Sequence, residues 1–119
     1  MRAGYKRSTR VADLLKREFA DLLLRRIKDP RVQGITITDV ELTEDLRHAR
    51  VYFTLIGDQQ RREEAVRGLE SAKGFVRREI GQALRIKYIP EIEFKYDSSF
   101  DHAERMETLF HQIKHHDLA

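Results

Sequence analysis

Two neighbouring segments in which apolar and polar residues alternate constrain the fold most strongly. Residues 49–56 alternate like a strand with one apolar side, and residues 35–43 alternate in a similar way. Only the turn at residues 43–47 lies between them, which predicts an antiparallel hairpin because parallel strands need a much longer connection. The apolar side of the second strand consists of Ala49, Val51, Phe53 and Leu55.

The alternation in the first of these strands changes phase partway along. Ile35 and Ile37 share one parity, whereas Val40 and Leu42 share the other. A bulge near Thr38-Asp39 would return both pairs to the core side of the strand. We therefore predict a bulged strand.

Helical patterns flank the hairpin. The first begins at Ser8 or Thr9, either of which can cap a helix, and ends at residues 28–30 because a residue before proline avoids helical angles. The second follows the potential cap Asp58, falters at residues 72–74 and then resumes. The predicted inward residues are Val11, Leu15, Phe19, Leu22 and Ile27 in the first helix, then Ala65, Val66, Leu69 and Ala72, and after the interruption Val76, Ile80, Ala83 and Leu84.

A third strand and a last helix complete the chain. Ile92, Phe94 and Tyr96 alternate with charged residues after Pro90, and Ser98 or Ser99 could cap a helix bearing Met106, Leu109, Phe110 and Ile113. The order α-β-β-α-kink-α-β with a C-terminal helix predicts a two-layer α+β domain. A length of 119 residues without a linker fits a single domain. We assign residues 1–110 to it, including a basic N-terminal arm, and residues 111–119 to a tail.

The net charge of +3 conceals four blocks of alternating sign. Residues 1–31 carry a net +6 and residues 61–87 a net +4, whereas residues 32–60 carry −3 and residues 88–119 carry −4. If the two basic blocks meet in space, a polyanion is the natural partner.

Several functional classes are disfavoured by what the sequence contains. There is no cysteine, so disulfides, thiolate metal sites and cysteine nucleophiles are excluded. No secretory or membrane-spanning segment is recognisable, and we expect a cytoplasmic protein without a membrane partner. His111 and His115 have metal-pair spacing but no further ligand, and no catalytic motif is present. We therefore expect no metal, no cofactor and no enzymatic activity.

The interruption at Ala72-Lys73-Gly74 has two interpretations. Glycine inside a helix costs about 0.5–1 kcal/mol relative to alanine, so a break there needs a reason. One reason is packing of both helical runs on the sheet. The other is ligand approach, in which a phosphate reaches backbone N–H groups at the N-terminus of the following helix. The tripeptide alone favours packing, and both interpretations predict that Gly74→Val destabilises the domain.

A helix–kink–helix on a three-stranded sheet is the type II KH arrangement, whose GXXG loop clamps single-stranded nucleic acid. At this point the sequence resembles the ribosome-binding factor A family over roughly residues 5–110, and in that family an A-x-G kink replaces GXXG. The matching segments are Arg10-Val11-Ala12, Lys28-Asp29-Pro30-Arg31, residues 35–40, residues 45–49, Val51-Tyr52-Phe53, residues 71–77 and Ile89-Pro90-Glu91-Ile92.

The resemblance implies a non-enzymatic, monomeric factor that binds the immature small ribosomal subunit and its rRNA. It also implies a role in late maturation and rRNA end processing, an association with growth at low temperature, and release by a maturation GTPase. We expect Lys73 and Arg77 to be exposed and to hold phosphates. For Arg85 and Lys87, favourable placement at a helix C-terminus is as good an explanation as RNA contact. The candidate RNA-binding residues are Arg2, Lys6, Arg7, Arg10, Ala72, Lys73, Gly74, Arg77, Arg78, Arg85 and Lys87.

A different class of function remains as the alternative. A KH-like protein-interaction module would use the acidic sheet face and the C-terminal helix to bind its partner. Tyr52, on the opposite parity from the core residues, could stack a base, but covering the sheet explains it better.

Overall fold

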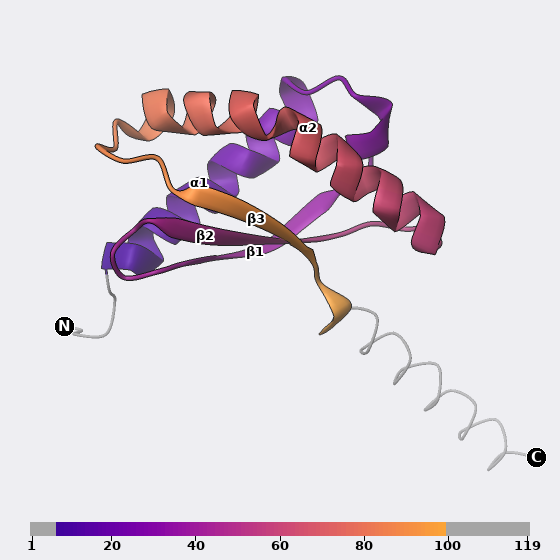
Figure 1. Cartoon of the computed structure of the whole chain (residues 1–119), viewed down its shortest axis with the longest axis horizontal. Coiled ribbons are helices and arrows are strands. Elements are labelled where there is room, and N and C mark those ends of the chain that lie inside the picture. The colour runs from indigo at the N-terminus through magenta and orange to yellow at the C-terminus, as the bar shows by residue number, and fades with distance from the viewer. Residues whose placement is uncertain (1–6, 100–119) are drawn as a thin grey trace, which may run out of the picture.

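Six elements follow one another in the computed structural model, which describes residues 7–99 (Figure 1). The predicted C-terminal helix, the tail and its histidines lie outside these residues, as do Arg2 and Lys6. The elements are α1 (Arg7–Arg25), the 3₁₀ helix η1 (Pro30–Val32), β1 (Thr36–Leu42), β2 (His48–Thr54), α2 (Gln59–Leu84) and β3 (Glu91–Tyr96).

The three strands form one sheet in the order β1-β2-β3. β1 and β2 pair antiparallel as predicted, and β3 runs parallel to β2 because α2 carries the chain back across the sheet. The predicted bulge is confirmed: Ile37 pairs with Phe53 and Asp39 with Tyr52, which leaves Thr38 as the extra residue. As a result, Ile37 and Val40 are both buried despite their opposite parity.

The core lies between one face of the sheet and the two long helices (Figure 1). Leu15, Phe19 and Leu22 of α1 are fully buried, as the apolar stripe predicted, and the Phe19 ring meets Phe94 edge to face at 5.7 Å between centroids. The predicted helix ends need correction. α1 already begins at Arg7, so that Ser8 is a buried residue of its first turn, and α1 ends at Arg25, which leaves the half-buried Ile27 beyond it.

Helix α2 corrects the prediction of two helical runs, because Gln59–Leu84 is one continuous helix through residues 72–74. Its axis changes direction midway, as Figure 1 shows, without ending the helix. The predicted cap is confirmed, since Asp58 accepts a hydrogen bond from the backbone N–H of Arg61 at 2.9 Å. Val76 and Ile80 are buried as predicted, but Ala83 is exposed.

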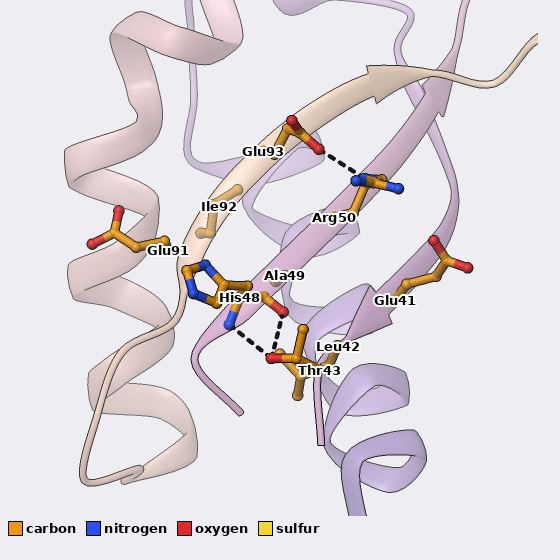
Figure 2. A pocket seen from close by; sticks show the side chains of 9 residues that line it. All are labelled: Glu41, Leu42, Thr43, His48, Ala49, Arg50, Glu91, Ile92 and Glu93. Atoms are coloured by element: carbon orange, nitrogen blue, oxygen red, sulfur yellow. Dashed lines mark hydrogen bonds and ion pairs between the residues drawn. The ribbon is translucent and has the colours of Figure 1, made fainter. Parts of the chain in front are cut away.

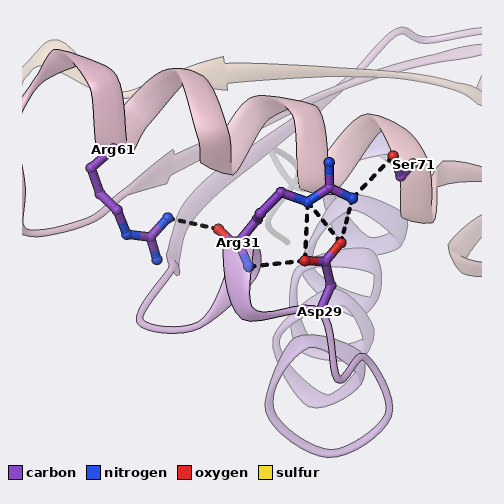
Figure 3. Close-up of polar contacts among 4 residues, drawn as sticks. All are labelled: Asp29, Arg31, Arg61 and Ser71. Atoms are coloured by element: carbon purple, nitrogen blue, oxygen red, sulfur yellow. Dashed lines mark hydrogen bonds and ion pairs between the residues drawn. The ribbon is translucent and has the colours of Figure 1, made fainter.

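A polar network fastens the α1–β1 connection to α2 (Figure 3). Asp29 caps η1 and accepts hydrogen bonds from both the backbone and the guanidinium of Arg31, which also reaches Ser71 Oγ at 3.4 Å. The side-chain hydrogen bond from Arg31 lowers the pKa of Asp29. Arg61 donates to the backbone carbonyl of Arg31 at 2.8 Å. The Lys28-Asp29-Pro30-Arg31 segment therefore has a structural role in holding this connection.

Close packing accompanies this network. A Cβ added at Gly68 would lie 2.8 Å from Arg31 Cβ and 2.9 Å from Val32 Cγ1, which is closer than packed carbon atoms tolerate. Glycine at this position therefore lets η1 approach the helix.

Candidate nucleic-acid interface

Three segments that are distant in sequence meet at one end of the molecule: the start of α1, the β1–β2 turn and the α2–β3 connection (Figure 1). Between them lies a groove of about 600 Å³. The groove is lined by Arg7, Val11, Leu14, Leu42, Asp45, Leu46, Leu84, Arg85, Ile86, Lys87, Tyr88 and Pro90. Because Arg7 comes from the first basic block and Arg85 and Lys87 from the second, the two blocks meet here.

An exposed aromatic side chain distinguishes this groove, which we call the terminal groove. Tyr88 is 56% exposed, and its ring lies 4.9 Å from the guanidinium carbon of Arg47 and 5.4 Å from Lys87 Nζ. Sequence reasoning missed both Tyr88 and Arg47. For Tyr88 the available signal was an aromatic residue beside a lysine in a short connection between two elements. For Arg47 there was no such signal, because it is distant in sequence and only the fold brings it to the ring.

The α2–β3 connection is held firmly directly after Tyr88. Arg77 donates from Nε to the carbonyl of Pro90 and from Nη2 to the carbonyl of Ile89, both at 3.1 Å. A Cβ at Gly81 would lie 2.7 Å from Ile89 Cδ1, so the missing side chain makes room for Ile89. Arg85 ends the helix with a left-handed φ of 52°.

The predicted site in the middle of α2 is largely engaged in contacts within the protein. The Lys73 side chain is 28% exposed, forms an ion pair with Glu70 at 2.7 Å and lies 5.8 Å from the Phe94 ring centre. The Arg77 side chain is 32% exposed and lies 3.5 Å from Glu91. The expectation that Lys73 and Arg77 are exposed is therefore wrong.

The interpretation of residues 72–74 as a place where a phosphate reaches backbone N–H groups also needs correction. A continuous α-helix has no second N-terminus at this point, since its backbone N–H groups donate to carbonyls four residues earlier. Ala72 is half-buried against the core, while Gly74 is exposed. A Cβ at Gly74 would meet nothing within 4 Å, so the position has room for the methyl group of alanine. Destabilisation by Gly74→Val stays a prediction.

The other candidate cations within residues 7–99 lie on exposed positions. Arg10 is on α1 close to the groove residues Arg7 and Val11, and Arg78 is on α2. Within residues 7–99, no acidic side chain forms an ion pair with Arg78 or Arg85. Arg78 and Arg85 are therefore available to an external anion.

The open face of the sheet forms a second, smaller depression of about 480 Å³ (Figure 2). Arg50 donates to Glu93 at 2.7 Å, and this hydrogen bond lowers the pKa of the Glu93 carboxyl. Tyr52 donates to Glu41 at 2.7 Å, which agrees with its interpretation as cover for the sheet. Glu93 and Glu41 therefore have hydrogen-bond partners within the sheet. The predicted C-terminal helix, which the protein-interaction alternative also needs, lies outside the described residues.

Residues 7–99 contain no group of three His, Asp or Glu side chains arranged to hold a metal ion. In the same part of the chain, no helix has the length and apolar character needed to span a bilayer.

Comparison with known proteins adds independent information about this fold. A Syntrophobacter fumaroxidans ribosome-binding factor A is 50% identical over 111 residues, which cover 92% of this chain and 95% of the relative. The crystal structure of ribosome-binding factor A from Thermus thermophilus matches with a TM-score of 0.66 at 25% identity, covering 75% of this chain and 94% of that one.

A homology model of the Thermus thermophilus factor, fitted into a cryo-electron-microscopy map of its complex with 30S, matches with a TM-score of 0.62 at 25% identity. That match covers 73% of this chain and 91% of the other. The family model described as ribosome-binding factor A matches residues 7–110, nearly the whole chain. With these matches and the shared α+β architecture, the chain belongs to the ribosome-binding factor A family.

Proposed function

We propose that this protein is a non-enzymatic assembly factor that binds the immature small ribosomal subunit and contacts its rRNA through the terminal groove. The observation that carries the proposal is the convergence of Arg7, Arg85 and Lys87 around one groove. Family membership supports it, because a relative with the same fold has been placed in a complex with 30S.

The mechanism rests on phosphate electrostatics. Exposed guanidinium and ammonium groups attract the rRNA backbone and release its counterions, without the need for base-specific hydrogen bonds. Arg10 and Arg78 extend the cationic surface beyond the groove, and Arg2 and Lys6 of the N-terminal arm would add to it. Lys73 and Arg77, which are engaged within the protein, contribute mainly by supporting the fold.

Binding that favours one conformation of the immature subunit shifts its population toward that conformation, and no covalent step is required. On this basis the protein promotes late maturation and rRNA end processing as a cytoplasmic monomer, supports growth at low temperature, and leaves when a maturation GTPase remodels the particle.

Co-sedimentation with small subunits tests this function. The double variant Arg85→Glu/Lys87→Glu should bind more weakly than the wild type. The control Arg67→Glu/Lys95→Glu changes the net charge equally at exposed positions outside the groove and should bind normally. Equal binding by all three folded proteins would refute the role of the groove.

The salt dependence of RNA binding provides a second measurement. Each single-strand phosphate contact contributes a slope of about −0.7 in log affinity against log salt. The Arg85→Glu/Lys87→Glu variant should therefore show a shallower slope than the wild type, while the control variant keeps the wild-type slope.

A further inference from the structure

We propose that the terminal groove receives one unstacked nucleotide of a single RNA strand, with its base on the Tyr88 ring and its phosphates beside Arg47, Lys87 and Arg85. This assignment rests on the proposed function and adds to it the chemistry of the bound element. Electrostatic attachment to a phosphate backbone requires no aromatic side chain, so Tyr88 is what points to a base.

Tyr88 is exposed although the two residues that follow it are not. Its neighbours in the connection point inward, since Pro90 is fully buried and Ile89 packs on Gly81. Tyr88 is instead 56% exposed and lies in the groove with Leu14, which is 45% exposed. The two side chains give the groove an apolar surface for a flat ligand.

The fold also holds the segment directly after Tyr88 in place before any ligand arrives. The two hydrogen bonds from Arg77 fix the carbonyls of Ile89 and Pro90, immediately after the tyrosine. On the other side, Arg85 has the left-handed backbone conformation that helices usually reserve for glycine or asparagine. An arginine at this strained position indicates that its side chain is needed there.

The chemistry around the ring also matches a nucleotide. A nucleotide combines an aromatic base with an anionic phosphate, and Arg47 and Lys87 lie over the Tyr88 ring with their charged groups 4.9 and 5.4 Å from its centre. For the base to stack on the ring, a cation must move from the ring face to the phosphate. Tyrosine rings and guanidinium planes both stack on unpaired bases. A volume of about 600 Å³ falls within the range of roughly 300–1,000 Å³ typical of small-ligand pockets.

The acidic member of the groove does not oppose this placement. Asp45 accepts hydrogen bonds from Thr43 Oγ1 at 2.6 Å and from the backbone N–H of Arg47 at 3.1 Å, so its carboxylate is engaged within the β1–β2 turn. These hydrogen bonds lower the pKa of Asp45, with that from Thr43 the larger cause. Phosphates would therefore lie toward the cations of the α2–β3 connection.

The experiment compares two RNA probes by fluorescence anisotropy with the full chain: a labelled oligoadenylate and an abasic ribose-phosphate oligomer of the same length. Tyr88→Ala should weaken oligoadenylate binding about tenfold, in line with the usual effect of removing a stacking aromatic, and leave abasic binding unchanged. Tyr88→Phe should retain oligoadenylate binding, since the ring and not the hydroxyl stacks.

The matched control is Tyr52→Ala, which removes a tyrosine from the open sheet face and should not alter binding of either probe. Equal losses of both probes on Tyr88→Ala would overturn the stacking assignment. The assignment would also be overturned if Tyr88→Ala lost small-subunit binding but bound oligoadenylate like the wild type. The groove would then receive a protein segment.

Failure of this inference is distinguishable from failure of the proposed function. If Tyr88→Ala binds both probes like the wild type while Arg85→Glu/Lys87→Glu is weakened, stacking is refuted and the phosphate surface stands. If the charge reversal leaves small-subunit binding intact, the proposed function of the groove fails as well.

Discussion

The middle of α2 and the segment that follows its C-terminal end both carry basic side chains, but the two regions use them differently. In the middle, Lys73 forms an ion pair with Glu70 and Arg77 binds backbone carbonyls of the next connection. At the end, Arg85 and Lys87 line an exposed groove together with Arg7. The first region holds the fold together and the second is open to a ligand.

The comparison shows that the density of positive charge along a sequence does not identify which cations bind a ligand. A guanidinium has five donors, and a neighbouring carbonyl or carboxylate engages them wherever the fold supplies one. Arg77 meets the carbonyls of the α2–β3 connection, whereas Arg85 meets no acidic partner within residues 7–99. Five predictions test this contrast, from the largest expected effect to the smallest.

Gly68→Val should cause the largest loss of stability. Its Cβ would already overlap Arg31 and Val32, and forcing extra atoms into a packed contact costs about 1–3 kcal/mol. Urea denaturation measures the change in the free energy of unfolding. An unchanged midpoint would mean that η1 moves away freely and that the middle of α2 is less constrained than its contacts indicate.

Arg77→Ala should lower the free energy of unfolding by about 1–2 kcal/mol, because two backbone carbonyls lose their donors. It should also weaken oligoadenylate binding by releasing the connection that carries Tyr88.

The neighbouring variant Arg78→Ala is the control for Arg77, since it removes an exposed charge and should leave the unfolding midpoint unchanged. Arg77→Lys keeps the charge but not the pair of hydrogen bonds, so we expect it to behave like Arg77→Ala. Wild-type stability in Arg77→Lys would contradict a clamping role.

Arg85→Gly should raise the free energy of unfolding by about 1 kcal/mol while weakening RNA binding. Glycine adopts the left-handed conformation without the penalty of roughly 1–2 kcal/mol that other residues bear. Calorimetry and anisotropy measured on the same sample check both effects. If stability and RNA affinity rise together, the arginine is not retained for binding.

Gly74→Ala should stabilise the protein by about 0.5–1 kcal/mol, since the position is helical, exposed and free of steric contact. Thermal denaturation checks this prediction. A clear destabilisation would restore the interpretation that the glycine is required by the bend in α2.

The smallest expected effect is a loss of stability at low pH through protonation of Asp29. The pKa of Asp29 is lowered in the folded protein, chiefly by its side-chain hydrogen bond with Arg31. The stabilisation by this interaction is therefore complete above the unfolded pKa of about 4. It is lost as the pH falls through the lower pKa of the folded state. Urea midpoints should therefore decline below about pH 4. The decline should be shallower in Asp29→Asn, and identical acid slopes would contradict this account.

Much of the fold was predictable because local patterns are visible in one chain. The phase shift between Ile37 and Val40 predicted the bulge, and Asp58 predicted the start of α2, since both features involve only neighbouring residues. Gly74 does not interrupt the helix as its residue type predicts. Glycine lowers helix propensity, but burial of Val76 and Ile80 against the sheet continues the helix regardless.

The candidate site was predictable only in outline. Arg85 and Lys87 were identified by charge, but Tyr88 and Arg47 were not, because their contact joins two connections 41 positions apart in the numbering. Arg77 was misjudged for the same reason, since the carbonyls it binds belong to the next connection. The ion pair of Lys73 with Glu70, by contrast, has a helical i, i+3 spacing that the sequence itself displays.

By itself, the sequence determined the two-layer α+β architecture, the family resemblance and the presence of two basic blocks, because periodicity, turn residues and charge are local properties. Only the tertiary structure decided which cations are engaged within the protein and which line a groove. That outcome depends on which backbone and side-chain atoms the packed elements bring within hydrogen-bonding distance, as Arg77 and Arg85 show on the same helix.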